Sequence, residues 1–180
     1  AAGLVAGDVF VSAVTGSSGS GRTPLANTHH PERRSNLYAY SPLAHRHEEE
    51  MRVLLGAARG GVEPEVCSVP QPGPFVRGIH ATLRLTLGAP VPAEEIALLI
   101  NRFYERGPFV HATTVPPRLT EVVGTNRCRI GVAVRGATLV LLSVIDNLVK
   151  GAAGGGVQWM NRLFGLPDDT GLRLAGLGYY

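Results

Sequence analysis

The sequence predicts an α+β fold, in which helices pack on one face of a mixed, largely antiparallel sheet. Two observations support this class. Predicted strands outnumber predicted helices, and most of them follow each other through hairpins or single-helix connections. In addition, apolar and polar residues alternate without a break from Ile79 to Leu87, so one face of this strand belongs to the core. The other face is polar enough for solvent, or for a subunit interface that keeps some water.

Length and composition limit the possible classes of protein. With 180 residues and 44% hydrophobic content, the chain is long enough for a single domain over residues 1–180. No apolar run reaches the roughly 18 residues that span a bilayer, and the amino end lacks a secretory signal, so we expect a cytoplasmic protein without membrane contact. The net charge is +3, but the basic residues do not cluster, so we expect no nucleic-acid partner. Two cysteines, Cys67 and Cys128, are too few for a disulfide framework.

The first strand is expected at 8–15, and a loop rich in glycine and serine follows it at 16–22. The backbone N–H groups of this loop, the hydroxyls of Ser17 and Ser18, and the guanidinium of Arg22 can wrap an anion. Composition alone favours a flexible connector instead.

A second strand is expected at 36–40. The adjacent His29 and His30 before it indicate a turn rather than a metal site, because no third ligand stands at a recognised spacing.

A helix is expected to begin near 45–47, with three glutamates in its first turn, where they complement the helix dipole. We interpret Glu48 and Glu49 as solvated, whereas Glu50 lies on the side of the turn that carries His47. A histidine beside a carboxylate at the start of a helix can act as a general base. A His-x-His pair is nevertheless more often simply exposed.

The remaining elements follow from alternation, helical spacing and turn residues. We expect strands at 62–69, 77–87, 109–113, 129–134 and 138–145 and a helix at 90–107. The prolines that follow residue 69 predict a stiff loop, and Gly136 predicts the hairpin turn between the last two strands.

The segment 147–165 is predicted to be a helix, because its apolar residues recur at helical spacing. It is unusual in holding four glycines, Gly151, Gly154, Gly155 and Gly156. Each glycine in a helix interior costs about 0.8–1 kcal/mol relative to alanine. We therefore expect the backbone of this segment to approach a neighbouring strand or a ligand closely.

Several ordered blocks, spread over almost the whole chain, carry a resemblance to a known family. They are Thr15-Gly-Ser-Ser-Gly-Ser-Gly-Arg22, His29-His-Pro-Glu-Arg33, Tyr40 with His45-Arg-His47 and Glu50, Arg77-Gly-Ile79, Gly124-Thr-Asn126, Ile145-Asp-Asn-Leu-Val-Lys-Gly-Ala-Ala-Gly154, Val157-Gln-Trp-Met-Asn161 and Phe164-Gly-Leu-Pro-Asp168. Together they resemble the N-acetyl-gamma-glutamyl-phosphate reductases and the lysine-pathway aminoadipyl-phosphate reductases.

The resemblance implies the catalytic and dimerisation domain of a glyceraldehyde-3-phosphate dehydrogenase-like fold, with a homo-oligomer formed through the sheet. It implies that 147–165 is a closing helix that faces a cofactor domain. That N-terminal NADP-binding domain, with the nucleophilic cysteine, is expected to precede this chain. The implied reaction reduces an acyl phosphate to a semialdehyde through a cysteine thioester. Neither Cys67 nor Cys128 matches the nucleophile's context, so we expect no reductase activity from this chain alone.

The resemblance also carries over site residues. It assigns acid and base catalysis to His45, with Glu50 supporting it, and no metal. Substrate binding is assigned to Ser17, Ser18, Gly19, Arg22, Tyr40, Arg77 and Asn126, and cofactor binding to Asn147, Lys150 and Gly151. Pairing of Arg77 with an acidic neighbour is an equal alternative. The geometric expectation is that His45 and Asn147 converge on one pocket.

Three interpretations of function remain open from the sequence. We favour arginine biosynthesis, with N-acetylglutamyl phosphate as the substrate. The alternatives are a lysine-pathway reductase, whose substrate is one methylene longer, and a dimerisation module that has lost the chemistry.

Overall fold

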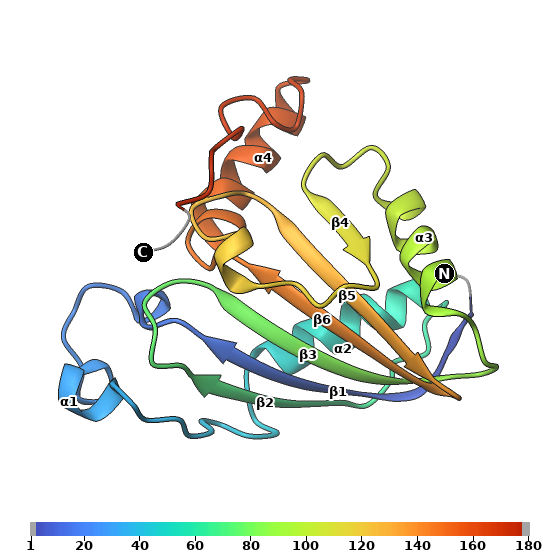
Figure 1. Cartoon of the computed structure of the whole chain (residues 1–180), viewed down its shortest axis with the longest axis horizontal. Coiled ribbons are helices and arrows are strands. Elements are labelled where there is room, and N and C mark those ends of the chain that lie inside the picture. Colours follow the sequence, from blue (N-terminus) through green and yellow to red (C-terminus); the bar gives the residue numbers. More distant parts are fainter. Residues whose placement is uncertain (1–2, 178–180) are drawn as a thin grey trace.

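A six-stranded mixed sheet, with strand order β2-β1-β3-β6-β5-β4, organises the computed structural model, which describes residues 3–177 (Figure 1). Its strands are β1 (Val5–Thr15), β2 (Val66–Pro72), β3 (Ile79–Leu87), β4 (Val110–Thr113), β5 (Cys128–Arg135) and β6 (Thr138–Ile145). The three central pairs are antiparallel, and the two edge pairs, β1 with β2 and β4 with β5, are parallel. The predicted mixed, mostly antiparallel sheet is confirmed.

Two helices, α2 (His47–Ala58) and α3 (Ala93–Phe103), cover one face of this sheet. The core between them contains Val9, Val11, Leu85, Leu87, Val132 and Leu139 from the strands, Ile96 and Ala97 from α3, and Met51 and Leu55 from α2 at its edge. Figure 1 shows α2 behind the sheet and α4 standing at one end of it. None of the helices described within residues 3–177 is long and apolar enough to cross a membrane.

The opposite face of β1 and β3 carries polar and exposed side chains. Thr82, Arg84 and Thr86 alternate with the core leucines of β3, as the sequence pattern predicts. Phe10 of β1 pairs with Arg84 in the sheet register and is 43% exposed. This part of the sheet is therefore a free surface.

Two predicted strands differ from the structure. Residues 36–40 form a loop that meets β2 only through the N–H of Tyr40, which donates to Pro70 O at 3.0 Å. Positive φ angles at Ser35 and Ser41, 61° and 44°, break the extended path on either side. The edge strand expected at 62–69 instead occupies Val66–Pro72. It runs through two prolines because an edge strand needs fewer N–H donors.

The long segment that connects β1 to α2 is anchored by one buried arginine, Arg33. It contains η1 (Ser17–Ser20), η2 (Ala26–Thr28) and α1 (His30–Arg33). Arg33 donates from Nη2 to Thr15 O at 3.0 Å and from Nε to Gly73 O at 3.2 Å. These bonds hold α1 against the ends of β1 and β2.

The segment predicted as one helix over 147–165 is divided into a π-helical turn, η4 (Val149–Ala153), and α4 (Gly154–Leu163). The N–H of Gly151 donates to Asp146 O at 2.9 Å, a five-residue spacing that widens the turn. A Cβ at Gly154 would lie 2.5 Å from Asn126 Oδ1. The expected close approach of this backbone to a neighbouring segment is therefore present at Gly154. It is not present at Gly156, where a Cβ would meet nothing within 4 Å.

Candidate active site

Asp146, the first residue after β6, joins three separate segments through one buried carboxylate. Oδ1 accepts the N–H groups of Leu148 and Val149 at 2.8 and 2.7 Å, and Oδ2 accepts the N–H of Gly124 at 2.7 Å. Arg77 Nη2 lies 2.9 Å from each oxygen. Burial alone would raise the pKa of Asp146, but the hydrogen bonds from Arg77 and the backbone outweigh it and lower that pKa. The carboxylate is therefore charged at neutral pH.

The next residue, Asn147, binds two further segments, and we call Asp146 and Asn147 together the junction. Its Oδ1 accepts the N–H of Gly78 at 2.6 Å, and its Nδ2 donates to Ser18 Oγ at 3.0 Å. The side chain is buried. Asn147 thus links the start of β3 to the loop that follows β1, and a Cβ at Gly19 would lie 3.5 Å from its Nδ2.

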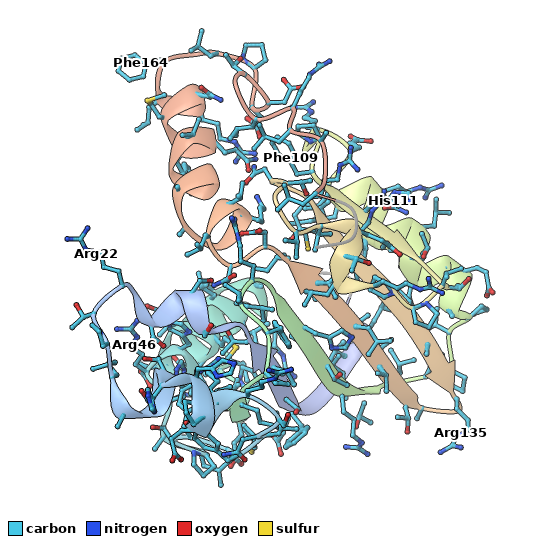
Figure 2. All side chains as sticks on the ribbon, turned by 60° about the vertical axis from the view of Figure 1, so that its left-hand side comes forward. Arg22, Arg46, Phe109, His111, Arg135 and Phe164 are labelled. Carbon is cyan, nitrogen blue, oxygen red and sulfur yellow. The ribbon has the colours of Figure 1, made fainter. Side chains whose placement is uncertain are left out.

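The loop after β1 has fewer free donors than its composition suggests. The N–H groups of Gly16, Ser17 and Ser18 are used by backbone oxygens of residues 75–78, at 2.8–3.0 Å. Ser18 Oγ also donates to Val76 O at 2.7 Å. Figure 2 shows Arg22 projecting away from the body of the molecule. The available polar groups of this loop therefore include the half-buried Ser17 hydroxyl, the exposed Gly19 backbone, the exposed Ser20 hydroxyl and the Arg22 side chain.

His45 lies in a second cluster, just before α2. Its ring makes edge contacts with Tyr40 and His47, with centroid distances of 5.6 and 4.6 Å. The N–H of His47 donates to His45 Nδ1 at 3.4 Å, a long bond. Burial, with His47 and Arg46, lowers the pKa of His45, while nearby glutamates act in the opposite direction. The imidazole is thus neutral at pH 7 and able to accept a proton.

The glutamates of the first turn of α2 have roles different from those expected. Glu48, interpreted as solvated, instead accepts the N–H of Ser68 in β2 at 2.6 Å. It is therefore the residue that fastens the start of α2 to the sheet. Glu50 is exposed and makes no hydrogen bond to His45 among the residues described. Its influence on the pKa of His45 is through space.

Asn126 and Lys150 lie beside the Asp146–Asn147 contacts, under α4, and bind neither of those two side chains. Asn126 is 0% exposed and donates from Nδ2 to Gln158 Oε1 at 3.2 Å. Lys150 Nζ donates to the same oxygen at 2.7 Å and lies 5.7 Å from the centre of the Phe109 ring. Burial lowers the pKa of Lys150. Figure 2 shows Phe109 between α4 and β4.

The structure therefore brings together Ser18, Gly19, Arg77 and Asn147, and groups Tyr40 with His45. No hydrogen bond or ring contact within residues 3–177 joins these two clusters. The sequence also missed Asp146, whose signal was an Asp-Asn pair between a strand and a helix, where side chains cap free N–H groups. It missed Asp168 as well, which accepts Gln158 Nε2 at 2.8 Å and pairs with Arg162 at 2.6 Å.

Both cysteines have raised thiol pKa values. Burial raises the pKa of Cys128, and burial together with Glu65 raises that of Cys67. Raised pKa values disfavour the reactive thiolate. Within the described part of the chain, no group of three His, Cys, Asp or Glu side chains could hold a metal ion.

Comparison with known families decides where the chain belongs. The model of the semialdehyde dehydrogenase dimerisation domain matches residues 1–147. The chain belongs to this family. Its members are oxidoreductases, and the name of the domain supports self-association.

Three curated relatives of this chain share one name, N-acetyl-gamma-glutamyl-phosphate reductase. The chain is 42% identical to an N-acetyl-gamma-glutamyl-phosphate reductase of Dehalococcoides mccartyi over 94% of its length. It is 38% identical to those of Bacteroides thetaiotaomicron and Christiangramia forsetii, over 95% and 99% of its length. These matches cover 50%, 52% and 54% of the relatives, so the chain spans about half the length of the curated relatives it matches.

Solved structures confirm the fold. Aspartate semialdehyde dehydrogenase II of Vibrio cholerae superposes with a TM-score of 0.66 at 17% identity, over 87% of this chain and 54% of that one. A probable aspartate-semialdehyde dehydrogenase of Pseudomonas aeruginosa gives 0.65 at 16% identity, over 89% and 56%. The predicted glyceraldehyde-3-phosphate dehydrogenase-like C-terminal domain is thus confirmed.

Proposed function

We propose that this chain is the catalytic and dimerisation half of an NADPH-dependent N-acetyl-gamma-glutamyl-phosphate reductase of arginine biosynthesis. The observation that carries the proposal is the 38–42% identity to proteins of that name over more than nine-tenths of the chain. Their shared name favours this substrate over the longer lysine-pathway one. A neutral, accessible His45 supports a catalytic role over a module that has lost the chemistry.

In the proposed reaction, a cysteine thiolate displaces phosphate from the acyl phosphate and forms a thioester. NADPH, when bound, would supply the hydride that reduces the thioester carbon in the second step. His45 accepts the thiol proton in the first step and returns a proton to the carbonyl oxygen in the second, after which the aldehyde leaves and the thiol is restored. Neither Cys67 nor Cys128 stands in the sequence context of the family's nucleophile, so we assign the nucleophile to the part of the longer relatives that this chain does not span. The raised pKa values of both thiols agree with this assignment.

The substrate is proposed to lie against the loop after β1. The half-buried Ser17 and the exposed Gly19 backbone and Arg22 side chain would hold the phosphate, while Ser18 is held in place by Asn147. Arg77 would hold a substrate oxygen with the part of its guanidinium that Asp146 does not occupy. Tyr40 would contact the substrate beside His45. Asn126, which is fully buried, would act by supporting α4.

Gly151 and Asn147, at the start of η4, would hold the nicotinamide end of NADP. Gly151 is exposed there, so its backbone permits close contact, and Asn147 supplies the neighbouring polar wall. The Lys150 ammonium, which donates to Gln158, would contribute charge at a greater distance. In this arrangement α4 is the closing helix that faces the cofactor domain.

A homo-oligomer is proposed to form through the free face of β1 and β3. Phe10 is an apolar, 43% exposed side chain at its centre, with Thr82 and Arg84 beside it. We expect Phe10→Asp to shift sedimentation velocity toward the monomer. Phe103→Asp, at an exposed site on α3, is the matched control and should leave assembly unchanged. Assembly unaffected by Phe10→Asp contradicts this interface.

The reductase is tested by NADPH oxidation that depends on N-acetylglutamyl phosphate. We expect turnover by the full-length protein, and none by this chain alone until it is combined with a cofactor-binding half. Faster turnover of the acyl phosphate that is one methylene longer would favour the lysine-pathway alternative. Turnover by the chain alone would contradict the placement of the nucleophile.

A further inference from the structure

We propose that Asp146 is a positioning residue that fixes the Arg77 guanidinium and the Asn147 amide at the same time. The inference rests on the proposed function, which assigns Arg77 to the substrate and Asn147 to the cofactor wall. Asp146 itself has no part in the reaction described above. It is nevertheless a fully buried charged group at the point where both residues meet.

Arg77 depends on this carboxylate for its position. Among residues 3–177, Asp146 accepts the hydrogen bond that the Arg77 side chain makes, through Nη2 at 2.9 Å. Arg77 Nε is buried and has no partner. The side chain is 29% exposed, so the guanidinium reaches the surface from a buried anchor. Without Asp146, nothing described in the structure would hold that orientation.

The same carboxylate also sets the backbone on either side of Asn147. Oδ1 holds the first N–H groups of the turn that leads into η4, and Oδ2 holds the turn at Gly124. Arg77 directly precedes Gly78, whose N–H binds Asn147 Oδ1 at 2.6 Å. Asp146 therefore fixes both partners of the hydrogen bond between Gly78 and Asn147. It holds the donor, the N–H of Gly78, through the neighbouring Arg77, and it holds the acceptor, Asn147 Oδ1, through the backbone that joins the two residues.

The choice of a carboxylate is informative. Asparagine or serine would satisfy free N–H groups at the start of a helix without burying a charge. A buried ion pair contributes little net stability compared with apolar packing. Since the gain in stability is small, the main consequence of the charge at Asp146 is the fixed direction of Arg77. A fixed direction of the guanidinium suits the substrate oxygen that the proposed function assigns to Arg77.

Asp146→Asn separates these roles. The amide keeps an oxygen for the N–H groups of Leu148 and Val149, but it places an NH2 group where Oδ2 met Gly124 and Arg77. In the full-length protein we expect the KM for N-acetylglutamyl phosphate to rise about 10- to 100-fold, as for loss of one charge-assisted hydrogen bond, with a smaller change in kcat. Glu63→Gln, which removes the partner of Arg52 in an exposed ion pair, is the control and should leave KM within about twofold, the small effect expected of a surface pair.

A double variant tests whether Asp146 acts through Arg77. If it does, Arg77→Gln with Asp146→Asn should have the KM of Arg77→Gln alone. The proposal would be overturned if the KM increases of the two single variants multiplied in the double variant. It would also be overturned by a KM within twofold of wild type in Asp146→Asn. If Asp146→Asn does not fold, Arg77→Lys replaces it, because a lysine lacks the planar fork that meets both oxygens. A normal KM in Arg77→Lys would equally overturn it.

A measurement without turnover keeps this inference distinct from the proposed function. In ¹⁵N NMR spectra of this chain, the Nε–H signal of Arg77 should be dispersed and slow to exchange, and it should collapse toward exposed arginine values in Asp146→Asn. An unchanged signal contradicts the positioning role. Absence of acyl-phosphate reduction by the wild-type full-length protein would instead contradict the proposed reductase function. The NMR test of the Asp146–Arg77 contact does not depend on that result.

Discussion

The His45 cluster and the Asp146–Asn147 junction are built in opposite ways. The junction side chains are almost fully buried, and backbone donors from several segments converge on them. His45 is only partly buried, and its ring nitrogen receives a single long bond from its neighbour. The junction therefore fixes positions, whereas the loop before α2 presents the group that the proposed function requires to exchange protons and to remain accessible.

Backbone geometry adds to this contrast. Leu43, two residues before His45, has a φ of 58°, which side chains rarely adopt. Its N–H donates to Ser68 O at 3.0 Å, which holds the bend against β2. Sparsely populated backbone conformations that persist are commonly found at functional sites. Variants of His45 in the loop should therefore act on proton transfer, and variants at the junction should act on the positions of Arg77 and Asn147.

The largest expected effect is on catalysis at His45. In the full-length protein, His45→Asn should lower kcat by about 10²–10⁴-fold, the usual contribution of a general acid and base. The melting temperature should stay nearly unchanged, because the ring makes few contacts. His111→Asn is the control, since His111 is an exposed histidine on β4 with no hydrogen bond or ring contact to His45 among the described residues. Equal losses in both variants would mean that His45 has no special role.

Next in size is a pair of glycine substitutions in α4 that tests the close approach near the junction. A Cβ at Gly154 would lie 2.5 Å from Asn126 Oδ1 and 2.8 Å from Val149 O. Gly154→Ala should therefore lower the free energy of unfolding by about 1–3 kcal/mol. Gly156→Ala has open space and should raise it by about 0.4–1 kcal/mol. Urea denaturation measures both, and a neutral Gly154→Ala would contradict the packing described.

A smaller effect is expected from acid. The hydrogen bonds from Arg162 and then Gln158 lower the pKa of Asp168 to about 2, whereas an unfolded aspartate titrates near about 3.9. The unfolded chain thus takes up the proton first, so this stabilisation is complete above about pH 5 and is lost as the pH falls from about 4 to 2. The pair lies near the surface, so we expect about 1 kcal/mol or less.

Denaturation at a series of pH values measures this contribution of Asp168 to the free energy of unfolding. The lowered pKa of the buried Asp146 acts with the same sign. Asp168→Asn should remove only its own share of the acid dependence. If that variant keeps the full dependence on pH, the low pKa of Asp168 does not contribute to stability.

The sheet was predictable because alternation and turn residues act locally. Each core position of β3 follows from the alternation of the strand, and the hairpin follows from Gly136, whose φ is 58°. The failures had non-local causes. The loop before α2 was read as a strand because its residues suit one, but positive φ angles at Ser35 and Ser41 interrupt it. Strand propensity cannot detect a bend imposed by contacts elsewhere.

The site was only partly predictable for the same reason. Residue type and resemblance indicate that Asn147 and Ser18 matter, and the structure joins them by a 3.0 Å hydrogen bond. The sequence could not separate Glu48 from Glu50, because both suit the first turn of a helix and only the position of β2 selects Glu48. It also could not give distances between clusters, since these depend on the strand order.

The smallest expected effect concerns Arg22, at the solvent end of the loop after β1. Figure 2 shows this side chain pointing outward, so Arg22→Gln should change the free energy of unfolding by less than about 0.5 kcal/mol. If the loop holds the substrate phosphate, the KM for the acyl phosphate should still rise severalfold and depend on salt, because an exposed charge is screened. Arg34→Gln, another exposed arginine before α2, is the matched control. Equal KM values in the two variants would restrict phosphate binding to the fixed part of the loop that Asn147 holds.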